Sequence, residues 1–130
     1  MLHRKTIVST QLITILKDSH QPLSVNQLMT ELQKHQLTPN KTTIYRILDK
    51  LKNNQEVIEI KTSLGTAYYE YATHQHHHFI CHSCDAVYCL DQAHLETNKI
   101  NAQALLPNKN FIVQSHEFNL HGICGSCATN

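Results

Sequence analysis

Long apolar runs are absent from the 130 residues of this chain. Residues 1–5 lead into a mixed polar and apolar stretch, so we expect neither a signal peptide nor a membrane span and predict a cytoplasmic protein. Two enzyme signatures are missing as well. His116-Glu117 meets its next histidine only at His121, one residue too late for the zinc-protease spacing. No Pro-Cys-x-x-Cys accompanies a His-x-Glu as in the zinc deaminases, so we do not predict an enzyme.

Cysteine is sparse, yet four of the five cysteines form two closely spaced pairs, Cys81-His82-Ser83-Cys84 and Cys124-Gly125-Ser126-Cys127. A two-residue gap lets one turn direct both sulfurs at one ion, and two such turns supply the ligands of a closed structural Zn²⁺ site. Residues 85–123 separate the pairs, so strands or a helix must bring them together. Two disulfides are the alternative, but nothing in the sequence marks a secreted chain. The spacing favours zinc.

The net charge of +1 conceals an uneven distribution. Residues 1–61 hold nine Lys or Arg against five Asp or Glu, whereas residues 62–130 hold two against five. A basic first half suits a nucleic-acid surface, and an acidic, histidine-rich second half suits cations. Solvated surface would explain both halves equally well, so charge alone does not decide between these readings.

The first half predicts three helices. Residues 5–17 carry apolar side chains at roughly the spacing of one helix face. Ser24 followed by Gln27 predicts a capping box that opens a second helix, which ends near His35. The third helix begins after Leu37-Thr38, with Pro39 at an early helical position where a missing N–H costs nothing, and continues through Leu51.

The exposed face of the third helix has the residue types of a helix that reads DNA. Hydroxyls and cations can meet phosphates, and an aromatic ring can contact thymine methyl groups. Residues 57–61 and 66–71 then predict a β-hairpin, so the order of elements is that of a winged helix. Many surface helices look similar, and the face by itself is a weak signal. The candidate DNA-binding residues are Lys41, Thr42, Thr43, Tyr45 and Arg46.

A histidine cluster precedes the first cysteine pair. Four histidines occur within residues 74–78, and on a strand His76 and His78 would share one face while His77 takes the other. One segment can thus serve two metal sites, with Glu59, Glu70 and Cys89 as further donors near it in sequence. A metal ion held by mixed ligands of this kind exchanges more readily than one held by four thiolates, and a metal sensor requires such exchange. A solvated polar stretch is the alternative, and the internal position of the cluster rules out a cloning tag.

The second half predicts a small α+β lobe. Residues 86–90 can form a strand, residues 92–105 a helix that Pro107-Asn108 ends, and residues 111–120 another strand. We expect Ile112 and Phe118 to be buried in that last strand and His116 to be available as a ligand.

Three segments in this order resemble the ferric uptake regulator (Fur) family of metal-responsive repressors. They are Thr42-Thr43-Ile44-Tyr45-Arg46-Ile47-Leu48, then His76-His77-His78-Phe79-Ile80-Cys81-His82-Ser83-Cys84, and finally His116 with Cys124-Gly125-Ser126-Cys127. The resemblance implies an α+β chain with a winged-helix DNA-binding domain, residues 1–73, and a small metal-binding dimerisation domain, residues 74–130. It also implies a homodimer that grips palindromic, double-stranded operator DNA when a sensing metal is bound.

The resemblance also implies three groups of metal ligands. The structural zinc would bind Cys81, Cys84, Cys124 and Cys127; the regulatory ion would draw on Glu59, Glu70, His76, His78 and Cys89; and a third site would use His77, Glu96 and His116.

The identity of the sensed metal depends on Cys89, whose other interpretation is a small buried core residue. A thiol ligand beside imidazoles favours Zn²⁺ over Fe²⁺ or Mn²⁺, so we predict the zinc uptake regulator (Zur) branch, with an iron-responsive regulator as the alternative. A zinc-storage or metallochaperone protein would explain the cysteines and histidines but not a basic winged helix.

Overall fold

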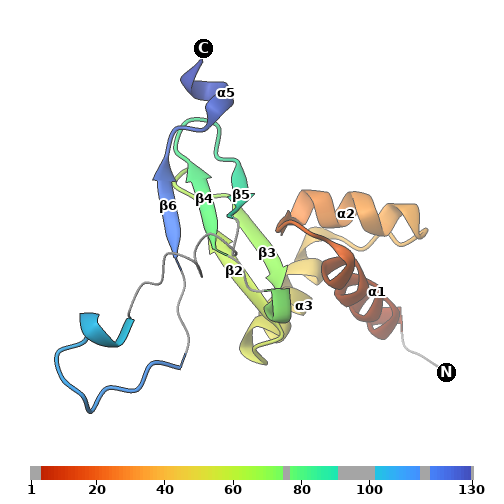
Figure 1. Ribbon diagram of the computed structural model, residues 1–130. Helices are drawn as coiled ribbons and strands as arrows, with labels where there is room; N and C mark the ends of the chain where they lie inside the picture. The colour runs from red at the N-terminus through yellow and green to blue at the C-terminus, as the bar shows by residue number, and fades with distance from the viewer. Residues whose placement is uncertain (1–3, 75–76, 91–101, 115–117, 130) are drawn as a thin grey trace. The chain divides into compact units, whose positions relative to one another are not determined.

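The computed structural model describes residues 4–74, 77–90, 102–114 and 118–129. The chain divides into two compact units, Met1–Gln75 and His76–Asn130. Helices and strands are mixed, as the sequence predicted (Figure 1). Within the described ranges, no helix is both long enough and apolar enough to cross a membrane.

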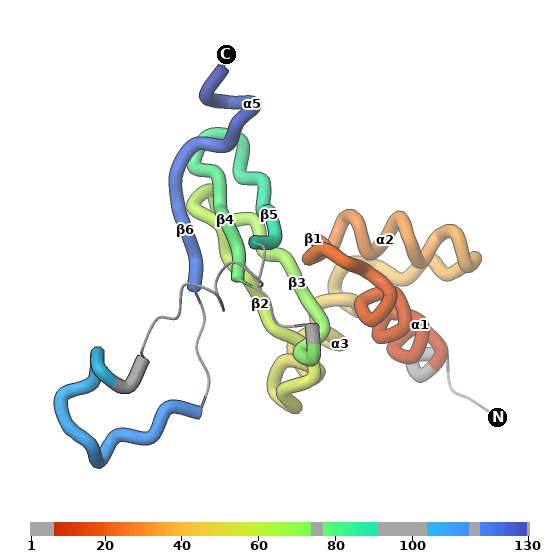
Figure 2. Tube along the Cα trace, viewed as in Figure 1, coloured from red at the N-terminus to blue at the C-terminus, as the bar shows by residue number. Residues whose placement is uncertain are grey.

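The first unit contains the three predicted helices and the predicted hairpin (Figure 2). Its elements are α1 (Arg4–Asp18), β1 (Leu23–Ser24), α2 (Val25–Lys34), α3 (Lys41–Asn53), β2 (Val57–Lys61), β3 (Ala67–Tyr71) and the 3₁₀ turn η1 (Ala72–His74). The sheet has the order β1-β3-β2, and both pairings are antiparallel. The short strand β1 was not predicted, because two residues carry no periodic signal; its Leu23 pairs with Tyr69 of β3.

Side chains define where α2 and α3 begin. The predicted capping box is present: Gln27 N–H donates to Ser24 Oγ at 3.2 Å, and Ser24 N–H donates to Gln27 Oε1 at 2.8 Å. The start of α3 differs from the prediction. Asn40 is its N-cap and accepts from Thr43 N–H at 2.8 Å, so Pro39 lies outside the helix.

Both helices end in the same backbone motif. After α2, Leu37 N–H donates to Leu32 O and Gln36 N–H to Gln33 O. After α3, an equivalent pair of bonds runs from Glu56 and Gln55 back into the last turn. These are Schellman motifs, which place one residue in the left-handed region. That residue is Gln36 in the first case and Gln55 in the second, with φ of 62° and 63°.

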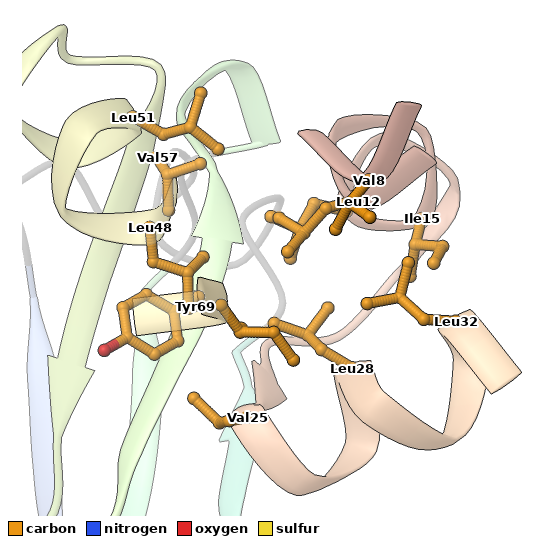
Figure 3. Packing of buried hydrophobic residues seen from close by; sticks show 12 residues of the cluster. Val8, Leu12, Ile15, Val25, Leu28, Leu32, Leu48, Leu51, Val57 and Tyr69 are labelled. Carbon is orange, nitrogen blue, oxygen red and sulfur yellow. The ribbon is translucent and has the colours of Figure 1, made fainter. Parts of the chain in front are cut away.

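The core of this unit forms where the helices meet the hairpin (Figure 3). Leu12 of α1, Leu28 of α2 and Leu48 of α3 are fully buried, and Val57 and Tyr69 close the core from the strands. The apolar stripe of α3 therefore faces inward, and its polar face is left for solvent or a partner.

The second unit is a three-stranded sheet with the order β5-β4-β6. Its elements are β4 (His78–Cys81), β5 (Val87–Cys89), the 3₁₀ turn η2 (Ala102–Leu105), β6 (Asn119–Gly122) and the short helix α5 (Gly125–Ala128). β4 pairs antiparallel with β5 but parallel with β6, and Cys81 lies opposite Gly122. Because β4 and β6 run in the same direction, their carboxyl ends lie at the same end of the sheet, and the turns that follow them start side by side.

One prediction for this unit is mostly untested and another needs correction. Residues 91–101, most of the predicted helix, lie outside the described ranges, and its last residues, Ala102–Leu105, form a 3₁₀ turn. The predicted strand at residues 111–120 is wrong: residues 111–114 lack regular structure, and the strand spans only Asn119–Gly122. Ile112 is 85% exposed rather than buried, and Phe118 is only partly buried. An alternating sequence becomes a strand only where a neighbouring strand can pair with it.

Candidate metal centre and nucleic-acid interface

Four sulfur atoms gather where β4 and β6 end. The Sγ atoms of Cys81, Cys84, Cys124 and Cys127 all lie within 4.8 Å of one another. The Sγ atoms of Cys84 and Cys124 are 3.8 Å apart. Sulfurs bound tetrahedrally to one zinc ion at about 2.3 Å would be about 3.8 Å apart, so this cluster has the dimensions of a Zn²⁺ site. All five cysteines are described and all are free thiols, in agreement with the choice of metal over disulfides.

Backbone amides converge on the most buried of these sulfurs. Cys81 Sγ accepts hydrogen bonds from the N–H groups of Ser83, Cys84 and Cys124, at 3.3, 3.4 and 3.3 Å. The backbone N–H of Cys84, followed by that of Cys124, lowers the pKa of the Cys81 thiol to about 6, although burial opposes the shift. The fold therefore favours a thiolate at Cys81, which is the form that binds metal.

The other thiols do not all follow Cys81. The pKa of Cys124 is lowered, first by the backbone N–H of Cys127 and then by the Tyr88 hydroxyl. For Cys84, the backbone N–H of Ala86 acts in the same direction, but its side-chain contact with Cys81 and its burial raise its pKa on balance. Cys81 and Cys124 thus favour the thiolate, whereas the pKa values of Cys84 and Cys127 are raised on balance, as expected of negative charges crowded together. A divalent cation would relieve that repulsion, and this donor set fits Zn²⁺ bound by all four sulfurs.

The polar face of α3 is accessible, as predicted for a reading helix. Lys41, Thr42, Tyr45 and Arg46 are exposed, and Thr43 is half-buried. Cations, hydroxyls and one aromatic ring therefore occupy the solvent side of a single helix, the side opposite the core leucines. These are the groups that contact phosphates and base edges in a major groove.

The predicted regulatory ligands Glu59 and Glu70 lie on opposite faces of the β2–β3 hairpin. Glu59 is opposite Tyr69 in the antiparallel register, whereas Glu70 is opposite Ile58. Residues directly opposite share a face and neighbours along a strand alternate, so the two carboxylates point away from each other. One ion cannot bind both while the hairpin is intact, which corrects the prediction that they belong to one site.

Glu59 already has two partners within the first unit. Its Oε2 accepts a hydrogen bond from the Tyr69 hydroxyl at 2.9 Å, and its Oε1 lies 3.4 Å from Lys52 Nζ of α3. Glu59 is on the helix-facing side of the hairpin, where Tyr69 belongs to the core. These contacts give Glu59 a structural role that joins the hairpin to the end of α3. Glu70, on the other face, is buried.

His78 and Cys89 are brought together by the second sheet. They lie directly opposite each other in the β4–β5 pairing, so their side chains share a face. His78 is buried and Cys89 is half-buried. An imidazole and a thiol side by side can supply two ligands of a mixed-ligand site. The remaining predicted partner in this segment, His76, lies outside the described residues.

His77, a predicted ligand of the third metal site, is engaged by the backbone of the second unit. Its Nδ1 accepts a hydrogen bond from Phe118 N–H at 2.8 Å, and the two rings meet edge to face. An imidazole that accepts at Nδ1 carries its proton on Nε2, so a metal ion would have to displace either this hydrogen bond or that proton to bind His77. The other predicted ligands of this site, Glu96 and His116, lie outside the described part of the chain.

One residue beside the cysteine cluster was not predicted from the sequence. The Tyr88 hydroxyl hydrogen bonds to Cys124, and that bond is the main cause of the raised pKa of Tyr88. Tyr88 lies in β5, four residues beyond the first cysteine pair, and only the pairing of the strands brings it near the second pair. No motif in the sequence indicates this contact.

The fold and the cluster together define a class of protein: a winged-helix unit joined to a small unit that holds a four-cysteine metal centre. Over residues 3–127 the chain matches the ferric uptake regulator family, and it belongs to that family. The resemblance predicted from its motifs is thereby confirmed, as is the α+β fold class.

Relatives with known names carry the same family name. The ferric uptake regulation protein of Bacillus subtilis is 32% identical over 89 residues, which cover 65% of this chain and 58% of that protein. The corresponding protein of Bordetella parapertussis is 28% identical over 86 residues, which cover 65% and 60%. These alignments thus span about three fifths of the length of each relative.

Solved structures resemble the whole chain more completely. The ferric uptake regulator of Helicobacter pylori, described as having three functional metal-binding sites, matches with a TM-score of 0.74 at 20% identity, covering 94% of this chain and 80% of that one. A zinc uptake regulator from M. tuberculosis matches with a TM-score of 0.52 at 25% identity, covering 95% of each chain. Iron-named and zinc-named regulators thus share this fold, and the fold does not separate the two branches.

Proposed function

We propose that this protein is a metal-dependent transcriptional repressor. As a homodimer it binds palindromic operator DNA when its sensing metal is bound, and it controls genes of metal uptake. The observation that carries the proposal is the presence, in one chain, of a winged helix with an exposed polar α3 face and a four-cysteine cluster of zinc dimensions. A zinc-storage protein would need only the second of these features.

DNA binding is assigned to the α3 face. Lys41, Tyr45 and Arg46 present two cations and a ring on the solvent side of a helix whose other side is anchored by buried leucines. A helix held in this way can enter a major groove without losing its own packing. Because cations dominate the face, affinity for DNA should fall steeply as salt rises.

The homodimer is assigned to the second unit, which leaves many large apolar side chains exposed for so small a sheet. They are Tyr88, Leu105, Phe111, Ile112, Val113, Leu120 and Ile123. Exposed apolar surface of this extent is typical of a protein interface. Two copies of a unit related by a twofold axis also match the symmetry of a palindromic operator.

Zinc is proposed as the sensed metal, with Glu70, His76, His78 and Cys89 as its ligands. The argument rests on Cys89, whose place opposite His78 puts a thiol beside an imidazole. Thiolate and imidazole donors suit Zn²⁺ better than Fe²⁺ or Mn²⁺. An iron-responsive regulator is the alternative, and it is the activity that the names of the relatives suggest. Glu59 is left out of the ligand set because Tyr69 and Lys52 engage it.

A DNA-binding measurement across metals tests the proposal. Duplexes enriched from a random palindromic pool by the zinc-loaded protein would be labelled, and their binding followed by fluorescence anisotropy. Zn²⁺, Fe²⁺ and Mn²⁺ would be added separately to protein that retains only its tightly bound zinc. We expect Zn²⁺ to raise the affinity most. A larger response to Fe²⁺ would support the iron alternative, and the absence of any metal-dependent binding would contradict the repressor function.

A further inference from the structure

Two histidines outside every predicted site lie together on the surface of the second unit. The rings of His82 and His121 are stacked, with centroids 5.5 Å apart and planes inclined by 25°. Both residues are exposed. His82 stands between the two cysteines of the first pair, yet neither histidine belongs to the four-cysteine cluster. The pair is therefore a separate group of nitrogen donors.

The backbone holds the two positions in place. His121 lies in β6 opposite Ile80 of β4, and the ladder continues with Cys81 opposite Gly122. Just beyond the end of β4, His82 N–H donates a hydrogen bond of 2.7 Å to Gly122 O. The residue after His121 is thus tied directly to His82. Bringing the two rings to one ion would need side-chain rotations but no movement of the backbone.

The ring separation matches that of two imidazoles bound to one ion. With zinc about 2.1 Å from a ring nitrogen, and that nitrogen about 1.1 Å from its ring centroid, each centroid lies about 3.2 Å from the metal. Two such rings at the tetrahedral angle have centroids about 5.2 Å apart. The observed separation of 5.5 Å is close to this value. The same separation is ordinary for a pair of aromatic rings, so it shows that the two imidazoles are within reach of one ion but does not by itself indicate one.

We propose that His82 and His121 form a surface binding site for a divalent first-row transition ion such as Zn²⁺, with water completing the coordination. Imidazole is a preferred ligand of zinc, copper and nickel, and the exposure of both rings leaves room for the waters. With two neutral ligands and no thiolate, the ion exchanges readily, unlike an ion held by four sulfurs. The site is independent of DNA binding and of the sensing ligands.

Ring-specific NMR tests the proposal on the full-length protein carrying its tightly bound zinc. Zn²⁺ alone would be titrated into protein labelled with ¹⁵N at histidine, and each ring followed through its long-range ¹H–¹⁵N signals. His82→Gln and His121→Gln assign the two rings. We expect both ring signals to shift with a single apparent Kd. In His82→Gln, the zinc concentration at which the His121 signal has shifted halfway should rise at least tenfold. The His82 signal should behave in the same way in His121→Gln.

His35→Gln is the matched control, because His35 is exposed but lies at the end of α2 in the other unit. It should leave both titrations unchanged. If His82→Gln disturbs the cysteine cluster, His121→Gln decides alone, since His121 lies outside both cysteine pairs. Two rings with different apparent Kd values, a His121 signal that titrates normally in His82→Gln, or no shift at millimolar zinc would each overturn the proposal.

Discussion

At the scale of single residues, the four cysteines are distinguished from the fifth by their neighbours. Cys81 and Cys124 are buried in the cluster, where amides reach their sulfurs, whereas Cys89 lies opposite His78 in a strand pairing. The same thiol group in different surroundings is therefore expected to play two different roles. The cluster cysteines should bind a permanent ion, and Cys89 should take part in an exchangeable site.

Cys81→Ser should therefore remove the tightly bound zinc and unfold the second unit, because a closed zinc site in a small sheet contributes folding free energy outright. Zinc content by mass spectrometry and near-UV circular dichroism would be measured after gel filtration. Cys89→Ser is the matched control and should keep the zinc and the fold. A Cys81→Ser protein that stays a folded, zinc-containing dimer would contradict the assignment of the structural site.

Tyr69 provides a second prediction at this scale. Burial, and then the hydrogen bond to Glu59, raises the pKa of its hydroxyl well above the ordinary value of about 10. The folded state holds this proton more tightly than the unfolded chain, so the contribution to stability is complete below about pH 10 and is lost as the pH rises further.

Tyr69→Phe should lower the free energy of unfolding by about 1 kcal/mol at pH 8, because one partly buried hydrogen bond is lost. It should also make stability less sensitive to pH above 10. Urea unfolding at pH 8, 10 and 11 measures both effects. Tyr45→Phe, which changes an exposed tyrosine, is the control. If Tyr69→Phe and the parent lost equal free energy of unfolding between pH 8 and pH 11, Tyr69 would not be the source of the pH dependence.

At the scale of elements, helix ends show how the chain tolerates residues that local rules disfavour. Gln36 and Gln55 occupy the left-handed position of a Schellman motif, where glycine is usual. Each side chain costs about 1 to 2 kcal/mol in that conformation. The hydrogen bonds of the motif and the packing of Leu37 hold the backbone there nonetheless.

Gln55→Gly should stabilise the first unit by about 0.5 to 1 kcal/mol, because the relief of strain exceeds the extra entropy that glycine loses on folding. Chemical denaturation followed by circular dichroism would detect this. Gln33→Gly introduces the same residue in the last turn of α2, where φ is helical, and should instead cost about 1 kcal/mol. A destabilised Gln55→Gly protein would indicate that the glutamine side chain makes a compensating contact.

The α3 face gives a prediction about DNA. Arg46→Ala and Tyr45→Ala should each weaken operator binding about tenfold or more while zinc content stays unchanged, because both side chains lie on the exposed side of the helix. Loss of Arg46 should also make the slope of log affinity against log salt concentration shallower by about one, because one phosphate contact is lost. Lys34→Ala removes an equal charge from α2 and serves as the control. If operator affinity in both α3 variants equalled that of the parent, the reading surface would have to lie elsewhere.

At the scale of the whole molecule, the tightly bound ion and the sensing ion should respond separately. His76→Ala or His78→Ala should leave a zinc-containing dimer that gains no operator affinity when metal is added, since the imidazoles bind the exchangeable ion. In the parent, the response should fade as the pH falls into the range where histidines protonate, because a protonated imidazole cannot bind metal. The cluster zinc should persist to lower pH. Anisotropy titrations at several pH values measure the operator-binding response, and the zinc content of the same samples measures retention of the cluster ion.

His35→Ala, an exposed histidine of the first unit, is the control for these titrations. A protein lacking both His76 and His78 that still responds to metal like the parent would remove the histidine cluster from the sensing site. Retention of the response at low pH in the parent would argue for ligands other than histidine.

Short-range signals were sufficient for much of this protein. The capping box at Ser24, the apolar stripe of α3 and the two-residue spacing of the cysteine pairs each depend on neighbours within one or two turns. Such patterns carry their own geometry, so the three helices and the hairpin of the first unit were predicted correctly. The closeness of the four thiols was predicted from the ligand number of zinc rather than from a local pattern. The role of the α3 face in DNA binding remains a prediction.

Contacts between distant segments were decided only by the tertiary structure. The register of β2 with β3 separates Glu59 from Glu70, although both are carboxylates in one hairpin. The Phe118 amide determines which nitrogen of His77 carries the proton, across 41 positions of sequence. Parallel pairing of β4 with β6 assembles the cysteine cluster and also sets His82 beside His121. A side chain's chemistry can be read from the sequence, but its direction and its partners depend on strand register, which no local pattern encodes.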